Sequence, residues 1–261
     1  LVRNGRIGKL KTIRIQMPCE QPHHLTAKGT TGPLKSPPVP SSLNWKFWQG
    51  HTQPVDYAPE RCHFWWRFVL NYGGGEMTDR GAHIIDIAQL AMGMDHSGPV
   101  KFQAQGKQIK DSPYDAFWDY EFTNTYENGV QMIGTTEGPR GLKFEGSDGS
   151  LFVAIHGGAL SASNPDILPG KIRAGGNVGI NDPIPDDFQV RLGRSPGHHR
   201  NFIDSVLSRK PTMATAEIGH RTATICHLNN MAMKLGRTIH WNPQREAIVD
   251  DREAGQLLVP P

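Results

Sequence analysis

Residues 116–136 read AFWDYEFTNTYENGVQMIGTT, and this stretch decides the fold. Aromatic and β-branched residues, which favour strands, lie on both sides of Asn128-Gly129. Asn-Gly is typical of a tight two-residue turn, because both of its residues adopt a positive φ readily. The segment therefore predicts two antiparallel strands, 116–125 and 130–136, joined as a β-hairpin.

Further strands are predicted on both sides of this hairpin. Residues 142–145 and 151–155 flank Ser147-Asp148-Gly149, which indicates a second hairpin. The remaining predicted strands are 9–17, 100–108 and a short strand at the start of 238–261.

Three helices are predicted, at 78–92, 199–208 and 217–235, from apolar residues that recur at helical spacing. The last of them has the clearest buried stripe, made of Ile218, Ile225, Leu228, Ala232 and Leu235. Helices at either end of a run of antiparallel strands indicate the α+β class. We expect one domain over residues 1–261.

Two segments rich in glycine, proline and polar residues, 18–59 and 157–187, are predicted as long loops. The tail after the strand near 238 is also expected to be mostly loop. The chain begins with what resembles the end of a helix, terminated by Gly5 and Gly8. We therefore expect it to be part of a longer protein.

The composition excludes several classes of protein. Of the 261 residues, 37% are hydrophobic and 20% are charged, which excludes a disordered chain and a coiled coil. A net charge of +3, without a block of like charges, gives no indication of a nucleic-acid or membrane partner. No apolar run is long enough to span a bilayer. Three scattered cysteines indicate neither a disulfide framework nor a zinc site, and they do not distinguish cytoplasm from periplasm.

The phosphate-binding and hydrolase motifs are missing from the sequence. It contains no GxGxxG, no P-loop, no HExxH and no GxSxG. We therefore expect no cofactor-binding residues for a dinucleotide, and no metal site, within this chain.

The clearest chemical pattern is GGGEMTDRGAHIID, residues 73–86. Asp79, His83 and Asp86 are spaced by four and three residues, which places them on one face of a helix. A carboxylate one turn before an imidazole can orient it, so His83 is a candidate general base. A purely structural role for both residues is equally open. In that case Asp79 is no more than a helix cap, and His83 is a core residue. The preceding glycines would allow a ligand or another chain segment to approach closely.

This motif resembles the substrate-site helix of the Gfo/Idh/MocA family of nicotinamide-dependent oxidoreductases. Segments along the whole chain share the resemblance, in order: LVRNGRIGK (1–9), LNWKFWQG (43–50), YAPERCH (57–63), HHRNFID (198–204), EIGHRTA (217–223) and LGR (235–237). The resemblance covers the C-terminal domain of that family. Within that family, the chain is similar to the subgroup that has a long Pro-rich insertion, which here corresponds to residues 18–59.

The resemblance implies an open, mainly antiparallel β-sheet with helices packed on one face. It implies an N-terminal Rossmann domain that is missing from this chain and that would bind NAD or NADP. It also implies a small carbohydrate substrate, and a homo-oligomer that covers an exposed apolar face of the sheet. Nucleic acid and membrane are not expected as partners.

By resemblance, His83 would take a proton from a sugar or polyol hydroxyl, and Asp79 would bind substrate and orient His83. The other candidate substrate-binding residues are His63, Arg67, His199 and Asp86. The adjacent His23 and His24 are predicted to be solvated. Arg80 stands where the family commonly has Trp, and Ile84 where it commonly has a second His. Both departures would change the wall of the substrate pocket.

Three functions are compatible with these residues. The first is the substrate-binding and catalytic half of an NAD(P)-dependent sugar or polyol dehydrogenase. The second is an NAD-assisted glycoside hydrolase or lyase on the same scaffold. The third is a binding or oligomerisation module without activity, which applies if the chain is complete.

Overall fold

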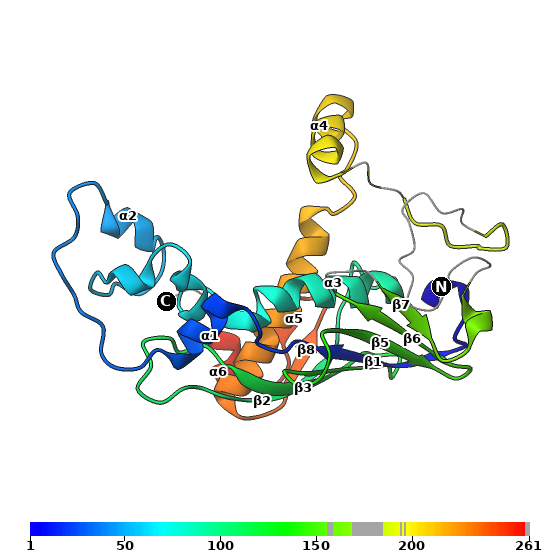
Figure 1. Cartoon of the computed structure of the whole chain (residues 1–261), viewed down its shortest axis with the longest axis horizontal. Helices are drawn as coiled ribbons and strands as arrows, with labels where there is room; N and C mark the ends of the chain where they lie inside the picture. The colour runs from blue at the N-terminus through cyan, green and yellow to red at the C-terminus, as the bar shows by residue number, and fades with distance from the viewer. Residues whose placement is uncertain (156–158, 169–184, 194, 196, 259–261) are drawn as a thin grey trace.

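The computed structural model describes residues 1–155, 159–168, 185–193, 195 and 197–258. Within them a nine-stranded sheet has the order β7-β6-β5-β1-β4-β3-β2-β8-β9. Figure 1 shows this sheet as one layer, with helices α3 and α5 covering one of its faces. The architecture is an open, mostly antiparallel sheet with helices on one side, which confirms the predicted fold class.

The strands are β1 (Leu10–Gln16), β2 (Lys101–Lys107), β3 (Asp119–Thr125), β4 (Gln131–Thr135), β5 (Gly141–Gly146), β6 (Ser150–Ala154), β7 (Leu160–Ala162), β8 (Ile239–Asn242) and β9 (Ala247–Ile248). The α-helices are α1 (Pro22–Gly29), α2 (Trp45–Gln49), α3 (Arg80–Met92), α4 (His198–Ser208), α5 (Ala216–Leu235) and α6 (Arg252–Gln256). Short 3₁₀ turns occur at Val2–Asn4, Pro59–Arg61, Trp65–Phe68, Gly75–Met77 and Pro165–Ile167.

The predicted hairpin is present as β3 and β4. The two strands pair antiparallel from Glu121 with Thr135 to Thr125 with Gln131. Gly129 closes the turn with a φ of 83°, a conformation that glycine adopts without steric cost. The hairpin predicted around Ser147-Asp148-Gly149 is also present, as β5 and β6.

Strand β1 lies in the middle of the sheet rather than at an edge. It pairs parallel with β4 and antiparallel with β5, so the sheet is mixed. The sequence predicts this strand, at 9–17, but does not indicate which strands it joins. Because β1 separates β4 from β5, the link between those two strands passes the end of β1.

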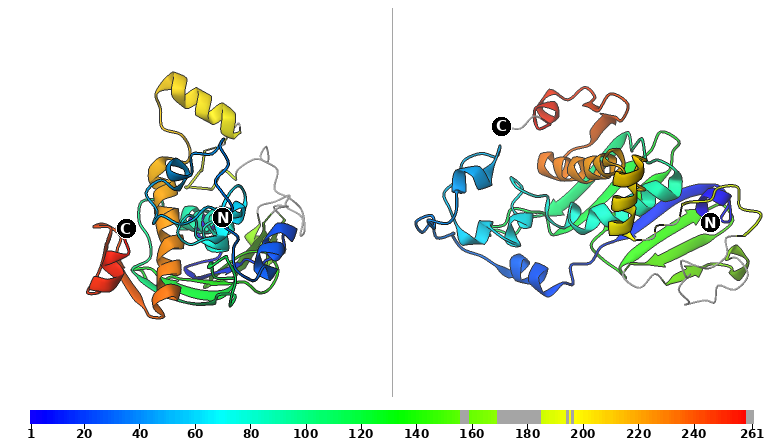
Figure 2. Two further views of the ribbon diagram at one scale, coloured as in Figure 1. Left: turned by 90° about the vertical axis from the view of Figure 1, so that its left-hand side faces the viewer. Right: turned by 90° about the horizontal axis from the view of Figure 1, so that it is seen from above.

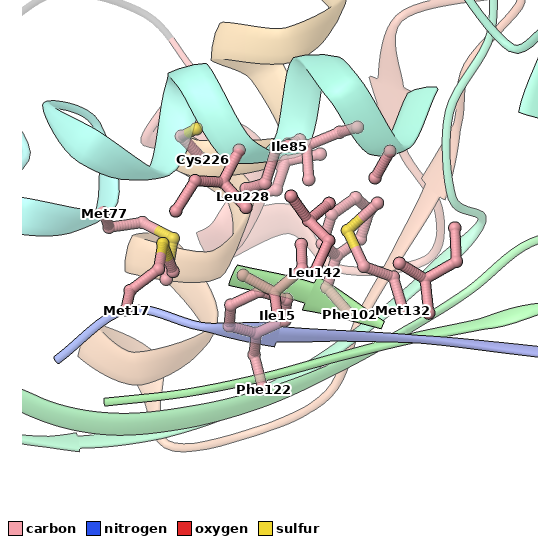
Figure 3. Packing of buried hydrophobic residues seen from close by; sticks show 14 of the residues in the cluster. Ile15, Met17, Met77, Ile85, Phe102, Phe122, Met132, Leu142, Cys226 and Leu228 are labelled. Atoms are coloured by element: carbon pink, nitrogen blue, oxygen red, sulfur yellow. The ribbon is translucent and has the colours of Figure 1, made fainter. Parts of the chain in front are cut away.

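The core lies between the sheet and helices α3 and α5. Ile15 of β1 and Phe122 of β3 point up toward the helices, and Ile85 of α3 and Leu228 of α5 point down to meet them (Figure 3). All four are at most 2% exposed. Full burial of such side chains contributes about 1.5–3 kcal/mol each to folding. This packing fixes the start of α3, and therefore the candidate site, against the end of β1.

The opposite face of the sheet is predominantly polar, and the expectation that it is apolar is wrong. Side chains such as Arg14, Gln103, Glu121 and Lys143 alternate with the buried ones. None of the large exposed apolar side chains belongs to β1–β6, all of which are fully described. Two apolar side chains on this outer face, Ile133 and Phe152, are half-buried.

Three predicted loops contain regular structure. Helices α1 and α2 fall inside 18–59, where the many prolines and glycines had indicated loop alone. Proline at the first position of α1 is compatible with a helix, because that position needs no N–H donor. Strand β7 falls inside 157–187, part of which lies outside the described residues, and α6 falls inside the tail.

Helix α4 stands clear of the sheet and of α3 in two perpendicular views (Figures 1 and 2). None of its residues is buried. Its apolar side chains Phe202, Ile203, Val206 and Leu207 are between 44% and 76% exposed. Among the described residues, no helix combines the length and the apolar character needed to cross a bilayer.

Candidate functional site

The start of α3 places Asp79 and His83 beside the end of β1. Asp79 is the residue before the first turn of α3, but its side chain makes no capping hydrogen bond. Its carboxylate is therefore available for other contacts, and the reading of Asp79 as only a helix cap is not supported. His83, one turn later, is exposed.

Asp79 and His83 line the same cavity, which has a volume of about 280 Å³. Ligand sites in proteins start at about this size. The wall comes from the segment after β1, the start of α3, the residue before β5 and the residue after β6. Its residues are Gln21, His23, His24, Asp79, Arg80, His83, Ile84, Arg140 and Ile155. Arg80 and Ile84, the two departures from the family pattern, both belong to the wall.

His24 is buried among charged groups, so the prediction that it is solvated is wrong. It is 2% exposed, and its Nδ1 contacts Oε1 of the buried Glu76. Its Nε2 lies 3.6 Å from Asp79 Oδ2. Burial, helped by the positive charge of Arg80, lowers the pKa of His24 to about 4. The imidazole is therefore neutral at physiological pH.

Glu76 and Arg80 form a buried ion pair beneath the cavity. Arg80 Nε donates to Glu76 Oε2 at 2.5 Å, and the two side chains are 10% and 1% exposed. A buried carboxylate costs much free energy unless it is paired, so Arg80 and His24 together account for the presence of Glu76.

Arg67, a predicted substrate-binding residue, is adjacent to Asp79. Its Nε lies 3.4 Å from Asp79 Oδ1. Its guanidinium also lies over the rings of Phe64 and Trp66, 4.5 and 4.9 Å from their centroids. Asp79 thus contacts Arg67 and His24, and in the described structure it makes no hydrogen bond to His83.

None of the four predicted substrate-binding residues belongs to the wall of this cavity: Arg67 only contacts Asp79, and the other three lie elsewhere. His63 is exposed and has a positive φ of 50°. His199 is exposed on the projecting helix α4. Asp86 accepts a hydrogen bond from Thr222 Oγ1 at 3.0 Å, which joins α3 to α5.

The glycine cluster is approached by other parts of the chain. A Cβ on Gly75 would lie 2.6 Å from the Cβ of Ala116. The carbonyl of Gly74 accepts a hydrogen bond from Asn230 Nδ2 at 2.9 Å. Gly73 and Gly74 also border a second cavity of about 640 Å³ along α5, which contains none of the predicted site residues.

The cavity-lining residues that sequence reasoning missed are Gln21, His23, His24, Arg140 and Ile155. His24 and Gln21 lie in a segment whose composition indicated loop, and Arg140 lies in a turn between strands. The one available signal was Pro22, which precedes His23 and His24 and is typical of the first position of a helix.

The described residues show no arrangement of side chains typical of a metal site. Within them, no group of three or more His, Cys, Asp and Glu side chains is arranged to hold a metal ion. The sequence has no glycine-rich phosphate loop.

Comparison with a family model gives a match over residues 1–164 and 178–261, to "Oxidoreductase family, C-terminal alpha/beta domain", of the Gfo/Idh/MocA group. Among curated proteins, none is similar enough in sequence to count as a match.

Solved structures share the fold at low sequence identity. One is an aldose-aldose oxidoreductase from Caulobacter crescentus complexed with glycerol, with a TM-score of 0.54, 15% identity, and coverage of 92% of this chain and 58% of that one. Another is the WlbA dehydrogenase from Bordetella pertussis with NADH and UDP-GlcNAcA, with a TM-score of 0.55, 10% identity, and coverage of 92% and 57%.

A third is a levoglucosan dehydrogenase with NADH and L-sorbose, with a TM-score of 0.53, 14% identity, and coverage of 92% and 60%. This chain therefore spans somewhat more than half the length of the proteins it matches. At these identities the likeness shows the fold alone.

Proposed function

Since the chain belongs to the Gfo/Idh/MocA oxidoreductase family, we propose that it forms the substrate side of the active site of an NAD(P)-dependent enzyme. The reaction is the oxidation of a hydroxyl group of a sugar, polyol or derivative. The observation that carries this proposal is the placement of Asp79 and His83 on the wall of one cavity of about 280 Å³.

His83 is the general base in this proposal. Its imidazole takes the proton of the substrate hydroxyl as the carbon of that hydroxyl loses a hydride. Asp79 holds the substrate through a hydrogen bond, and its own position is fixed by Arg67 at 3.4 Å and His24 at 3.6 Å. The nicotinamide, when bound, accepts the hydride.

The cofactor belongs, in this proposal, to a dinucleotide-binding domain that precedes Leu1 in the full-length protein. Support comes from the absence of GxGxxG in the sequence and from the longer chains of the structural neighbours. His63 and His199 remain predicted substrate contacts, which depend on a further domain or subunit closing over the cavity. For Asp86 we propose a structural role through Thr222.

A homo-oligomer is also proposed, with subunits meeting through the outer face of the sheet. Support comes from the location of that face, which α3 and α5 leave uncovered. Because the face is polar, hydrogen bonds and ion pairs would make up much of such an interface.

Titration with NADH tests whether the cofactor binds to an upstream domain while residues 1–261 bind the substrate. We expect NADH fluorescence to report binding to a protein extended upstream of Leu1, and no binding to residues 1–261 alone. Tight binding by residues 1–261 would contradict the proposed division, because the cofactor contacts would then lie within this chain.

Replacement of the base tests the chemistry. In the extended protein, His83→Ala should lower kcat for sugar or polyol oxidation by about 10²–10⁴-fold, as expected for loss of a general base. His240→Ala is the matched control, because His240 is an exposed histidine on β8. If kcat of His83→Ala equals that of the wild type, His83 is not the general base and its role is structural. Cleavage of a glycoside without net NADH formation would instead support the hydrolase or lyase alternative.

A further inference from the structure

Two arginines of the candidate site have hydrogen-bond donors that the protein does not use. Arg80 gives its Nε to Glu76, but its Nη1 and Nη2 are buried and have no partner among the described residues. A buried N–H group without an acceptor is rare in folded proteins, and for a charged group it is especially unfavourable. The unsatisfied donors therefore indicate that a bound molecule accepts their hydrogen bonds.

Arg140 also lines this cavity. Its side chain is 13% exposed, and its Nε is buried without a partner in the described part of the chain. Its Nη2 lies 2.9 Å from Oε2 of Glu20, a carboxylate whose side chain is 56% exposed. Arg140 is brought here by the link from β4 to β5, which passes the end of β1.

The acidic groups near the cavity each already face a nitrogen of another side chain. Glu76 is paired with Arg80 and contacts His24, and Asp79 faces Arg67 and His24. The wall thus combines occupied acceptors with unused guanidinium donors. A ligand that complements this wall supplies oxygen acceptors with negative charge.

We propose that Arg80 and Arg140 bind a carboxylate group of the substrate, so that the compound oxidised at His83 is a sugar acid rather than a neutral sugar. A guanidinium group matches a carboxylate in plane and charge, and such pairs are among the strongest hydrogen bonds in proteins. A cavity of about 280 Å³ holds a single sugar ring with this group. The inference rests on the proposed function, because it assigns the substrate class of the same site.

Calorimetric titration of residues 1–261 tests the inference without any cofactor. The probes are D-glucuronate, its neutral methyl ester, D-glucose and D-glucose 6-phosphate. We expect D-glucuronate to bind about tenfold or more tightly than D-glucose and the methyl ester, from the strength of a charge-assisted hydrogen bond. Equal binding of acid and neutral sugars, no binding of any probe, or tighter binding of the phosphate would overturn the carboxylate assignment.

Variants identify the responsible residues. Arg140→Gln should weaken D-glucuronate binding about tenfold and should weaken D-glucose binding by less than that. Arg80→Lys is preferred to a neutral replacement, since Glu76 needs a positive partner, and it should weaken D-glucuronate binding as well. Arg14→Gln is the matched control, because Arg14 lies on the outer face of the sheet and pairs with Glu145. Wild-type affinity for D-glucuronate in Arg140→Gln would overturn the proposal.

Different experimental results would contradict the carboxylate assignment and the proposed oxidoreductase function. If the extended protein reduces NAD(P) with neutral sugars as readily as with sugar acids, the carboxylate assignment fails and the oxidoreductase function stands. If D-glucuronate binds through Arg140 but no hydroxy compound is oxidised, the carboxylate site stands and the proposed function fails.

Discussion

His24 has chemistry that its sequence neighbours do not suggest. It lies in a segment with many prolines, yet it is 2% exposed and sits between two carboxylates, those of Glu76 and Asp79. Burial lowers its pKa to about 4, against an ordinary value of 6.5. The folded protein therefore holds the imidazole neutral over a pH range in which the unfolded chain would protonate it.

This shift in pKa predicts acid sensitivity. Between pH 6.5 and 4 the unfolded state binds a proton that native His24 does not bind, so stability falls as the pH falls. The contribution of His24 to that slope is about 1.4 kcal/mol per pH unit. His24→Gln should remove it, as measured by urea denaturation at pH 7.5, 6.0 and 5.0. His23→Gln, at the exposed neighbour, should keep the wild-type slope. Identical slopes in wild type and His24→Gln would contradict the assignment.

Some site residues could be predicted from the sequence because their relation is local. Asp79 and His83 are separated by one turn of one helix, so their spacing alone places them together. His24 and Arg140 come from two other segments, and only the position of β1 between β4 and β5 brings them to α3. A strand's amino acids define its buried face, but they do not define its partners.

Among the described α-helices, α4 is the one with no buried residue. Its apolar side chains recur at helical spacing, as the sequence indicated, but the structure leaves them exposed. Helix α5, predicted at 217–235 and found at Ala216–Leu235, instead buries nine residues against α3 and the sheet. Periodicity thus identified both helices, whereas it could not show that only one of them is packed.

The exposure of α4 predicts that polar substitutions on its apolar face are tolerated. Phe202→Ser combined with Leu207→Ser should leave the free energy of unfolding of residues 1–261 within about 1 kcal/mol of wild type, because little burial is lost. The same variant should reduce the fluorescence of a bound hydrophobic dye such as ANS. Arg200→Ser with Asp204→Ser, on the polar face of the helix, serves as the control. A large loss of stability would show that α4 packs against the body in solution.

At the scale of the whole molecule, the sheet has two chemically different faces. One is buried under α3 and α5, and the other presents mainly polar side chains around Ile133. Ile133 pairs with Arg14 on one side and Thr123 on the other, so it lies within the outer face. A second subunit on this face would bury that region.

The proposed oligomer predicts a mass above the 28.9 kDa of one chain in analytical ultracentrifugation. Ile133→Glu should shift the protein toward the monomer, because a charged carboxylate would lose its hydration on burial at the interface. Lys11→Glu, at an exposed position near the start of β1, is the control for an added negative charge. A monomer at all concentrations would contradict association through this face.

The central position of β1 also has a consequence for biosynthesis. Among the nine strands of this sheet, β1 is the first to leave the ribosome, but its partner β4 follows roughly 120 residues later, which at 5–20 residues per second is about 6–24 s. During that time the unpaired edges of β1 have no native partner, and the candidate site does not exist. The sheet can therefore form only after β4 and β5 have been synthesised. A factor that shields the nascent β1 strand until then should increase the yield of folded protein.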